Sequence, residues 1–549
     1  MGLTRSIPHL IRTDRNSGDA LTQLKSPDNA RQLAWIAPLA ALAVFVRIIG
    51  FDFLNWDDHE TIFQNTSLLP VTIQSFIDAW AKPHLSLWIP ITHTLWAMLA
   101  WIGGSEVEIS PTPFRLMSLA LHATTVWLVL DLLFRLLHSN RAALVGALLF
   151  AIHPIQVESV AWISGQKDLL AGLFMIASAR AFVMWREKLS PKYFVLTLAL
   201  GLCAMLSKPA AVTTPLIWLV IALMGRIDRA TIRLVMCGLL IALPIVFIAR
   251  EVQPASSIRP VAQIDRIPVA GDALVFYFKQ FVWPWPLVAD YARTPQSIAH
   301  DSLNWLKWIV PAALISLAFA VRKRIPELLG GLLIVIACVV PVLGFLPFEF
   351  QKYSTVSDHY LYAAMLGPAL IVAMIVARQR KAFGNVVALL AIASIFSFLQ
   401  TSHWRDTQSL FAHNLQHVPQ SLAANRTLAY LASQREDVER AEELYRAAST
   451  FRPDDELTAF NLANLLARQQ RLDESIEFYD RAIQIQPNRP TFRYNRAIVL
   501  MQLGRLDEAM IDTRQLLKIE PSNENAKRLQ SRLEELIANP TTQATTKPE

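Results

Sequence analysis

The stretch Phe51-Asp-Phe-Leu-Asn-Trp-Asp-Asp-His-Glu60 decides how the rest of the chain is interpreted, because it follows the first long apolar segment, residues 33–49. It places Asp57 and Asp58 at the boundary of a predicted membrane span. Ionisable side chains are costly in lipid, and those near a span usually lie in a watery cavity with a function. Two explanations stay open at this point: a solvated loop that merely ends a helix, or an acid/base centre.

The composition of the 549 residues indicates a polytopic membrane protein with a soluble C-terminal part. Hydrophobic residues make up 53% of the chain and charged residues only 17%, and apolar runs of roughly 20 residues recur. The formal net charge of +7 comes from short basic clusters between apolar segments, a positive-inside pattern that argues against nucleic-acid binding. Cys203, Cys237 and Cys338 lie in apolar segments without a C-x-x-C spacing, so we expect packing residues rather than disulfides or metal ligands.

We predict about eleven membrane-spanning helices, at residues 33–50, 114–137, 142–158, 168–185, 193–207, 212–225, 232–249, 304–321, 328–346, 360–377 and 383–400. With this number, every basic cluster between spans falls on the side of the basic N-terminal tail, residues 1–31, which is then cytoplasmic. The Trp- and Pro-rich stretches 86–102 and 273–288 are assigned to the membrane interface on the outer side. Counting the first of them as a span would place every later basic cluster outside the cell. Loops 51–113 and 250–303 are therefore external parts of a transmembrane domain, residues 32–401.

A 34-residue period begins after residue 401. Pro419, Pro453, Pro487 and Pro521 are 34 residues apart, and small and aromatic residues repeat at the same interval. Such a period with a closing proline is the tetratricopeptide repeat signature. We predict an α-solenoid over residues 402–537, with a half repeat (403–419), three full repeats (422–523) and a capping helix (523–537), followed by a disordered tail (538–549). The predicted fold class is all-α, and eleven spans place the repeats on the non-cytoplasmic side.

Polar residues at the outer ends of the predicted spans are the candidate site residues. Asp57 and Asp58 are adjacent, so they cannot both face one point, and one of them can serve as a general base. The neighbouring His59 and Glu60 suggest a metal, but no His-x-x-x-His or similar spacing accompanies them, and we expect neither a metal nor a cofactor. The other candidates are His153, Glu158, Lys167, Asp168, Lys208, Asp358, His359 and Tyr362.

These candidates also have purely structural explanations. Lys167 and Asp168 suit the solvated flank of a turn, and Lys208 suits a lysine whose ammonium reaches the lipid headgroups. Tyr362 suits an aromatic belt at the membrane interface. A cation at the depth of Lys208, however, would also suit the binding of a phosphate-bearing lipid.

Several motifs carry a resemblance to a known family: Trp56-Asp-Asp-His-Glu-Thr-Ile62 with Asn65, His153-Pro-Ile-Gln-Val-Glu-Ser-Val-Ala-Trp162, Lys167-Asp168, Ser207-Lys-Pro209, Trp283-Pro284 and Asp358-His-Tyr-Leu-Tyr362. Together they resemble the TMTC O-mannosyltransferases, multi-pass membrane proteins with C-terminal tetratricopeptide repeats in the GT-C class of glycosyltransferases. The resemblance covers residues 33–523. The Ser-Lys-Pro form and the Glu-Ser-Val-Ala-Trp run are similar to the bacterial branch, which implies a bacterial plasma membrane.

The resemblance implies that a sugar, such as mannose, moves from a polyprenyl-phosphate carrier to a protein or glycan acceptor on the non-cytoplasmic face. It singles out Asp57 as the base, with Asp58 as its support. It also implies that three cationic groups stabilise the departing lipid phosphate: Lys208, His359 and Lys167. The chain departs from the family where His359 stands in place of a frequent Arg and Ala363-Ala364 in place of a Pro.

Two other classes of function compete with the enzyme. A membrane-anchored scaffold would use the repeats to bind a protein partner, but it would not need the candidate residues to gather on one face. A transporter would place polar or Gly- and Pro-broken segments at the middle of the membrane, whereas here the polar residues gather at the ends of the spans. The clustering therefore favours the enzyme, with the repeats engaging its acceptor or a partner.

Overall fold

The computed structural model describes residues 34–65, 68–104, 109–252 and 261–538. Within these ranges the chain is helical and forms no β-strand, so the prediction of an all-α fold is confirmed. The chain divides into two compact units, residues 1–410 and 411–549. The predicted cytoplasmic tail (1–31) and the C-terminal tail beyond residue 538 lie outside the described residues.

Each of the eleven segments predicted as spans is helical in the first unit. Five are long and apolar enough to cross a membrane by length and composition: α5 (Thr112–Leu137), α8 (Gln166–Lys188), α11 (Arg229–Val252), α14 (Ile309–Val321, with a 3-10 turn from Ser302) and α17 (Ala382–Thr401). The other segments form shorter apolar helices: α2 (Ile36–Phe45), α6 (Asn140–Ile152), α9 (Pro191–Ser207), α10 (Thr214–Leu223), α15 (Pro326–Val339) and α16 (Leu366–Arg378).

Recognisable residues begin these helices. Proline occupies the first position of α9 and α15, where the missing N–H would have no partner inside the helix. The Ser139 hydroxyl accepts a hydrogen bond from Ala142 N–H at 3.4 Å and caps α6. The three cysteines are free, as expected, and Cys338 is buried.

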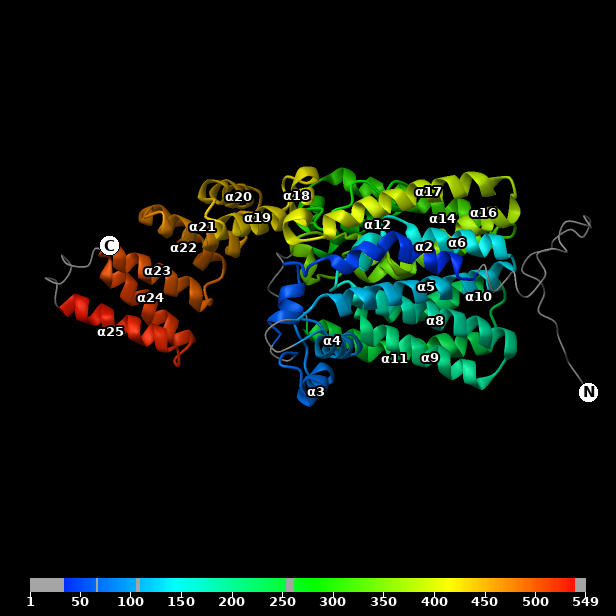
Figure 1. The fold of residues 1–549 in the computed structure, drawn as a ribbon, viewed down its shortest axis with the longest axis horizontal. Helices are drawn as coiled ribbons and strands as arrows, with labels where there is room; N and C mark the ends of the chain where they lie inside the picture. Colours follow the sequence, from blue (N-terminus) through cyan, green and yellow to red (C-terminus); the bar gives the residue numbers. More distant parts are fainter. Residues whose placement is uncertain (1–33, 66–67, 105–108, 253–260, 539–549) are drawn as a thin grey trace, which may run out of the picture. The chain divides into compact units, whose positions relative to one another are not determined.

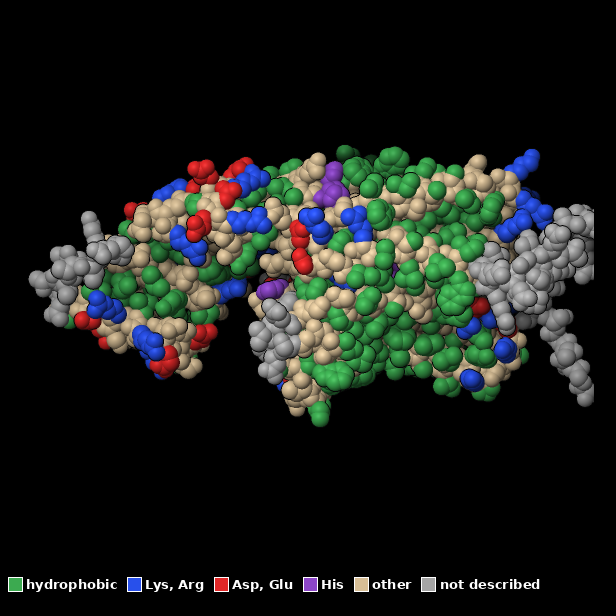
Figure 2. Space-filling view, viewed as in Figure 1, with side chains coloured by type: hydrophobic (Ala, Val, Ile, Leu, Met, Phe, Trp, Pro, Cys, Tyr) green, Lys and Arg blue, Asp and Glu red, His purple; other side chains and the backbone are tan. Residues whose placement is uncertain are grey.

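The long helices lie side by side along one direction (Figure 1). Helices α5 and α8 are the centre of the bundle, with 56% and 78% of their most apolar windows buried, whereas for α17 this share is only 11%. The exposed face of α17 is nevertheless apolar, and Leu389, Ile392 and Ile395 are each more than half exposed. A helix that exposes such a face has lipid around it, and Figure 2 shows hydrophobic side chains covering the flank of the bundle. The chain is a multi-pass membrane protein.

Ion pairs join the basic clusters at one end of this bundle. Arg135 of α5 pairs with Glu187 of α8 at 2.8 Å. Arg186 pairs with Asp228, which precedes α11, at 2.9 Å. Figure 2 likewise shows Lys and Arg side chains gathered at one end of the bundle, as the positive-inside prediction requires of clusters on a common side.

The predicted external loops contain helices of their own. They include α3 (Ile73–Ala81), α4 (Pro90–Gly103), α12 (Arg266–Val282) and α13 (Pro295–Ala299). Helices α4 and α12 do not simply lie on the surface, because Trp96 of α4 and Tyr277 of α12 are completely buried. Their outer faces are open, with Trp101 70% and Val282 84% exposed. Both helices are therefore amphipathic elements packed against the bundle.

The second unit consists of paired antiparallel helices in the predicted register. After α18 (Thr407–His417) come α19 (Leu422–Gln434) with α20 (Val438–Phe451), α21 (Glu456–Arg468) with α22 (Leu472–Ile485), α23 (Pro490–Gln502) with α24 (Leu506–Ile519), and a last helix α25 (Glu524–Ala538). The repeating small residues Ala429, Ala463 and Ala497 are fully buried where neighbouring helices meet. The 34-residue period thus reflects close packing at the same position of each pair.

Candidate functional site

A buried carboxylate joins the first external loop to the turn before α8. Asp58 is fully buried, and its Oδ1 accepts hydrogen bonds from the N–H of Ser164 at 2.9 Å and from the Ser164 hydroxyl at 2.6 Å. Its Oδ2 accepts a further bond from Leu54 N–H at 3.0 Å. Burial raises the pKa of Asp58, and these donors and the Arg115 guanidinium oppose that rise. The role of Asp58 is to fix the loop.

Three further contacts hold the same two segments together. Arg115, near the start of α5, donates to the carbonyls of Asp52 and Ala161 and is fully buried. The Trp162 indole N–H donates to the carbonyl of Trp56 at 2.9 Å. The hydroxyls of Thr61 and Ser164 lie 3.1 Å apart. The loop that carries Asp57 is therefore held rigidly on a frame of buried hydrogen bonds.

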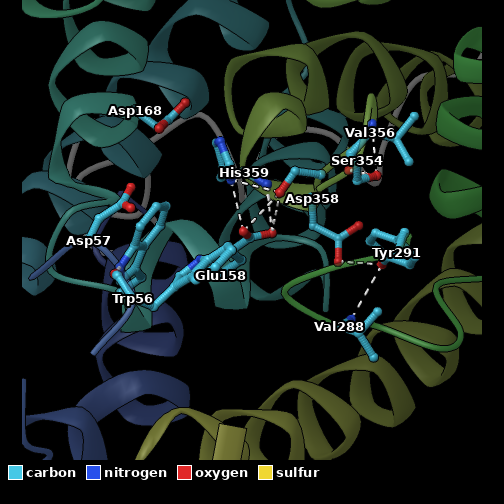
Figure 3. A network of polar contacts seen from close by, with 12 residues as sticks. Trp56, Asp57, Glu158, Asp168, Val288, Tyr291, Ser354, Val356, Asp358 and His359 are labelled. Carbon is cyan, nitrogen blue, oxygen red and sulfur yellow. Dashed lines mark hydrogen bonds and ion pairs between the residues drawn. The ribbon is translucent and has the colours of Figure 1, made fainter. Parts of the chain in front are cut away.

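Asp57 faces away from this frame. Its φ of +65° is a left-handed conformation that non-glycine residues adopt rarely and that often marks functional positions. Its side chain is 45% exposed, and its Oδ2 lies 3.9 Å from Nζ of Lys167. The ammonium of Lys167 also lies over the Trp162 ring, 4.5 Å from the centroid. Figure 3 shows Asp57 on the same side of the network as Asp168, the residue that follows Lys167 in α8.

A small cavity of about 40 Å³ opens next to α8. Four candidate residues line it: Asp168, Lys208, His359 and Tyr362. Tyr360 contributes a further polar wall, and the rest of the lining is small or apolar: Ala171, Gly172, Met175, Ala210, Ala211, Cys338, Val342 and Ala363. The cavity thus brings together residues from four separate stretches of the chain.

An ion pair forms one wall of the cavity. Nζ of Lys208, at the end of α9, donates to Oδ1 of Asp168 at 2.5 Å and lies 4.9 Å from the centroid of the Tyr360 ring. The side chains of Lys208 and Asp168 are only 15% and 7% exposed. Burial lowers the pKa of Lys208, whereas the nearby Asp168 carboxylate raises it.

His359 is held from behind by a buried carboxyl group. Its Nδ1 lies 2.8 Å from Oε1 of Glu158 and 2.8 Å from the Ser357 hydroxyl, and its backbone N–H donates to Oε2 of Glu158 at 3.0 Å. Figure 3 shows the opposite end of the imidazole turned away from Glu158, toward the side where Asp168 lies. Burial raises the pKa of Glu158 to about 8 and lowers the pKa of His359 well below its usual range. Glu158 therefore supports His359 rather than lining the cavity.

The remaining candidates point elsewhere. The Asp358 carboxylate accepts from the Tyr291 hydroxyl at 2.8 Å and from Gln280 at 3.3 Å, and Figure 3 shows it directed toward Tyr291. The Tyr362 hydroxyl lies 3.0 Å from Nδ1 of His122, so only its ring faces the cavity. His153 accepts a hydrogen bond from Ile155 N–H at 3.3 Å and is also hydrogen-bonded to the backbone of Phe281. In the structure, these contacts connect helices.

Residues that the sequence analysis did not select complete the site. They are Arg115, Ser164, Tyr291, Ser357 and Tyr360. Only Arg115 carries a signal in the sequence, since a cation near the start of an apolar helix demands a polar partner. The others are ordinary polar residues whose partners are distant along the chain.

Comparison with known proteins agrees with this architecture. Residues 90–249 match the family model described as dolichyl-phosphate-mannose-protein mannosyltransferase. Residues 426–490 and 462–534 match two tetratricopeptide repeat models. The chain is 29% identical over 200 residues to the protein O-mannosyl-transferase Tmtc1 of Drosophila melanogaster and 30% identical over 202 residues to TMTC4 of Homo sapiens.

The chain is similar to the TMTC protein O-mannosyl-transferases over about a third of its length. These alignments cover 34% and 32% of this chain but only 22% and 27% of the two relatives. The chain therefore matches about a quarter of the length of these relatives. Among solved structures, the apo oligosaccharyltransferase of Archaeoglobus fulgidus is 14% identical, with a TM-score of 0.41, and the match covers 68% of this chain and 56% of that protein.

Proposed function

We propose that this protein is a membrane glycosyltransferase that moves a sugar from a polyprenyl-phosphate carrier to a hydroxyl group of a protein or glycan acceptor. One arrangement carries the proposal. An exposed carboxylate, Asp57, is held in an unusual backbone conformation 3.9 Å from Lys167, and the next residue of that helix lines a cavity with Lys208 and His359. The relationship to protein O-mannosyl-transferases supports the same reaction class and makes mannose the first sugar to test.

In the proposed reaction Asp57 is the general base. It takes the proton from the acceptor hydroxyl, whose oxygen attacks the anomeric carbon of the donor. The bond between that carbon and the phosphate oxygen breaks, the electron pair leaves with the phosphate, and the configuration at the anomeric carbon inverts. The cation of Lys167 stabilises the negative charge of the departing lipid phosphate.

The exposure of the two aspartates supports the assignment of the base to Asp57. Both carboxylate oxygens of Asp58 accept hydrogen bonds from Leu54 or Ser164. A substrate could therefore reach Asp58 only if these hydrogen bonds of the loop were broken. The Asp57 carboxylate is accessible from outside. We further propose that the site faces the non-cytoplasmic side of a bacterial plasma membrane and that the repeats engage the acceptor or a partner protein.

A comparison of glycans on exported proteins by mass spectrometry tests this function. We compare cells that carry the wild type, the Asp57→Asn variant, the Glu60→Gln variant or no copy of the gene. Glu60 is an exposed acid of the same loop and serves as the matched control. Loss of one class of glycan in both the Asp57→Asn cells and the deletion supports the proposal. Identical glycans in the wild type and the deletion would favour a membrane-anchored scaffold without catalysis.

A further inference from the structure

The two carboxylate oxygens of Asp168 differ in their hydrogen bonding. Oδ1 of Asp168 is bound to Lys208, but Oδ2 is buried and has no hydrogen-bond partner among the described residues. An orphaned carboxylate oxygen costs free energy, and buried acceptors of this kind are rare in folded proteins. Asp168 lines the cavity. A ligand that donates a hydrogen bond there would satisfy this atom.

The cavity presents groups that suit hydroxyls better than a phosphate. The ammonium of Lys208 is already paired with the Asp168 carboxylate. This carboxylate offsets the positive charge that would otherwise attract a phosphate. A phosphate is also repelled by the free oxygen of Asp168. A hydroxyl, in contrast, donates to a carboxylate and accepts from an ammonium. A carboxylate–ammonium pair in a dry wall therefore matches two neighbouring hydroxyls of one molecule.

The other walls agree with this chemistry. The rings of Tyr360 and Tyr362 and the end of His359 turned away from Glu158 border the same cavity. Aromatic rings next to a few fixed polar groups are typical of sites that bind an amphipathic ligand such as a sugar. The volume of about 40 Å³ corresponds to roughly three water positions. A space of this size takes hydroxyl groups at one edge of a sugar ring and not the whole ring.

We propose that the cavity between Asp168, Lys208 and His359 is the sugar subsite, which binds two neighbouring hydroxyls of the sugar that the lipid carries. This inference rests on the proposed function and assigns different tasks to the two lysines. Lys208 with Asp168 recognises the sugar. Lys167, one residue before Asp168 and outside the ion pair of Lys208, holds the lipid phosphate close to Asp57.

The test measures binding of two lipids to the purified full-length protein in nanodiscs. The first lipid is polyprenyl-phosphate-mannose and the second is the same polyprenyl phosphate without a sugar. We expect the wild type to bind the first about 10 times more tightly, or better, because the subsite adds hydrogen bonds to a charged group. Asp168→Asn should remove most of this preference and leave binding of the sugar-free lipid within about twofold. The ratio of the two affinities within one protein does not depend on how much of the variant is folded.

A second variant separates the two tasks. Lys167→Met should weaken both lipids to a similar extent and keep the preference for the sugar-bearing lipid. The sugar subsite would be overturned if the wild type bound both lipids equally, or if Asp168→Asn weakened the binding of both lipids equally. Neither result would contradict the proposed transferase function. A wild type that binds neither lipid would overturn the proposed function itself. A wild-type preference that disappears only in Asp168→Asn supports the subsite.

Discussion

The carboxylate of Asp58 receives both the N–H and the hydroxyl of Ser164, a residue 106 positions further along the chain. The two residues join the first external loop to the turn before α8. Because Lys167 follows this turn at once and meets Asp57, the distance between Asp57 and Lys167 depends on this connection. The catalytic geometry that we propose therefore depends on a buried contact away from the reacting atoms.

Replacing Ser164 by alanine should loosen the loop. The change removes the hydroxyl bonds to Asp58 and Thr61, and we expect the membrane unit to lose about 1–3 kcal/mol of stability because the buried Asp58 carboxylate loses one of its three hydrogen-bond donors. Thermal unfolding in nanodiscs, followed by tryptophan fluorescence, measures the loss. Ser159→Ala is the matched control, because the Ser159 hydroxyl is buried without a hydrogen-bond partner in the described residues. If both variants unfold at the same temperature, the connection does not stabilise the fold.

The Glu158–His359 contact should make stability depend on pH. Burial raises the pKa of Glu158 to about 8 and lowers that of His359 well below 6.5. A carboxyl with a raised pKa binds its proton more tightly in the folded protein, so its stabilising contribution is lost as the pH rises toward 8. The lowered pKa of His359 has the opposite effect, but only below pH 6.5, where the unfolded imidazole takes up a proton.

We therefore expect the Tm of the membrane unit to fall between pH 6.5 and 8. Glu158→Gln should reduce this fall, and the remainder comes from Asp358 and Asp58, since burial also raises the pKa of both carboxyl groups. Glu60→Gln, at an exposed position, should leave the pH profile unchanged. A wild-type Tm that is constant across this range would contradict the prediction.

Gly172 allows the Tyr362 ring to pack against α8. A Cβ at this position would lie 2.5 Å from Cδ1 of Tyr362, which is buried and held by His122. We expect Gly172→Ala to cost about 1–3 kcal/mol, since a buried ring cannot move without overpacking its neighbours. Gly384→Ala, a helical glycine with open space around it, should be neutral or slightly stabilising. Equal Tm values for the two variants would show that the Tyr362 ring moves away from the added Cβ without a loss of stability.

The repeat unit contains a buried charge that can be tested independently. Asp512 is completely buried and pairs with Arg496 at 2.6 Å and with Arg493 at 3.2 Å. Asp512→Ala should destabilise the repeat unit by about 3–5 kcal/mol, because two partly buried guanidinium groups lose the fully buried carboxylate that they share. The exposed pair of Glu508 and Arg505 is screened by water and should contribute little, so Glu508→Ala is the control. Circular dichroism of the two variants during heating distinguishes these outcomes.

Patterns that are local in the sequence predicted most of the fold. Apolar runs predicted the helices of the eleven candidate spans, and the 34-residue period predicted the helical repeats. The short loop helices α3 and α13 were not predicted. The predictions for α4 and α12 were less complete. The tryptophans within α4 and just after α12 indicated a membrane interface, and the sequence could not show that Trp96 and Tyr277 lie inside the protein.

The candidate site was harder to predict for a physical reason. Charged residues such as Asp57 and Lys208 stand out among apolar neighbours, whereas Ser164 and Tyr360 owe their roles to partners far away in the sequence. The sequence also could not distinguish residues that line the cavity, such as Asp168, from residues such as Asp358 that bind Tyr291 instead. That distinction depends on side-chain direction, which only the packed helices determine.

The general-base role of Asp57 is tested most directly by an assay of sugar transfer. The full-length protein in proteoliposomes transfers labelled sugar from a polyprenyl-phosphate donor to an acceptor peptide. If Asp57 is the general base, Asp57→Asn should lower kcat by about 10²–10⁴-fold and leave donor binding nearly unchanged. Glu60→Gln should transfer at close to the wild-type rate. Full transfer by Asp57→Asn would show that Asp57 is not the general base.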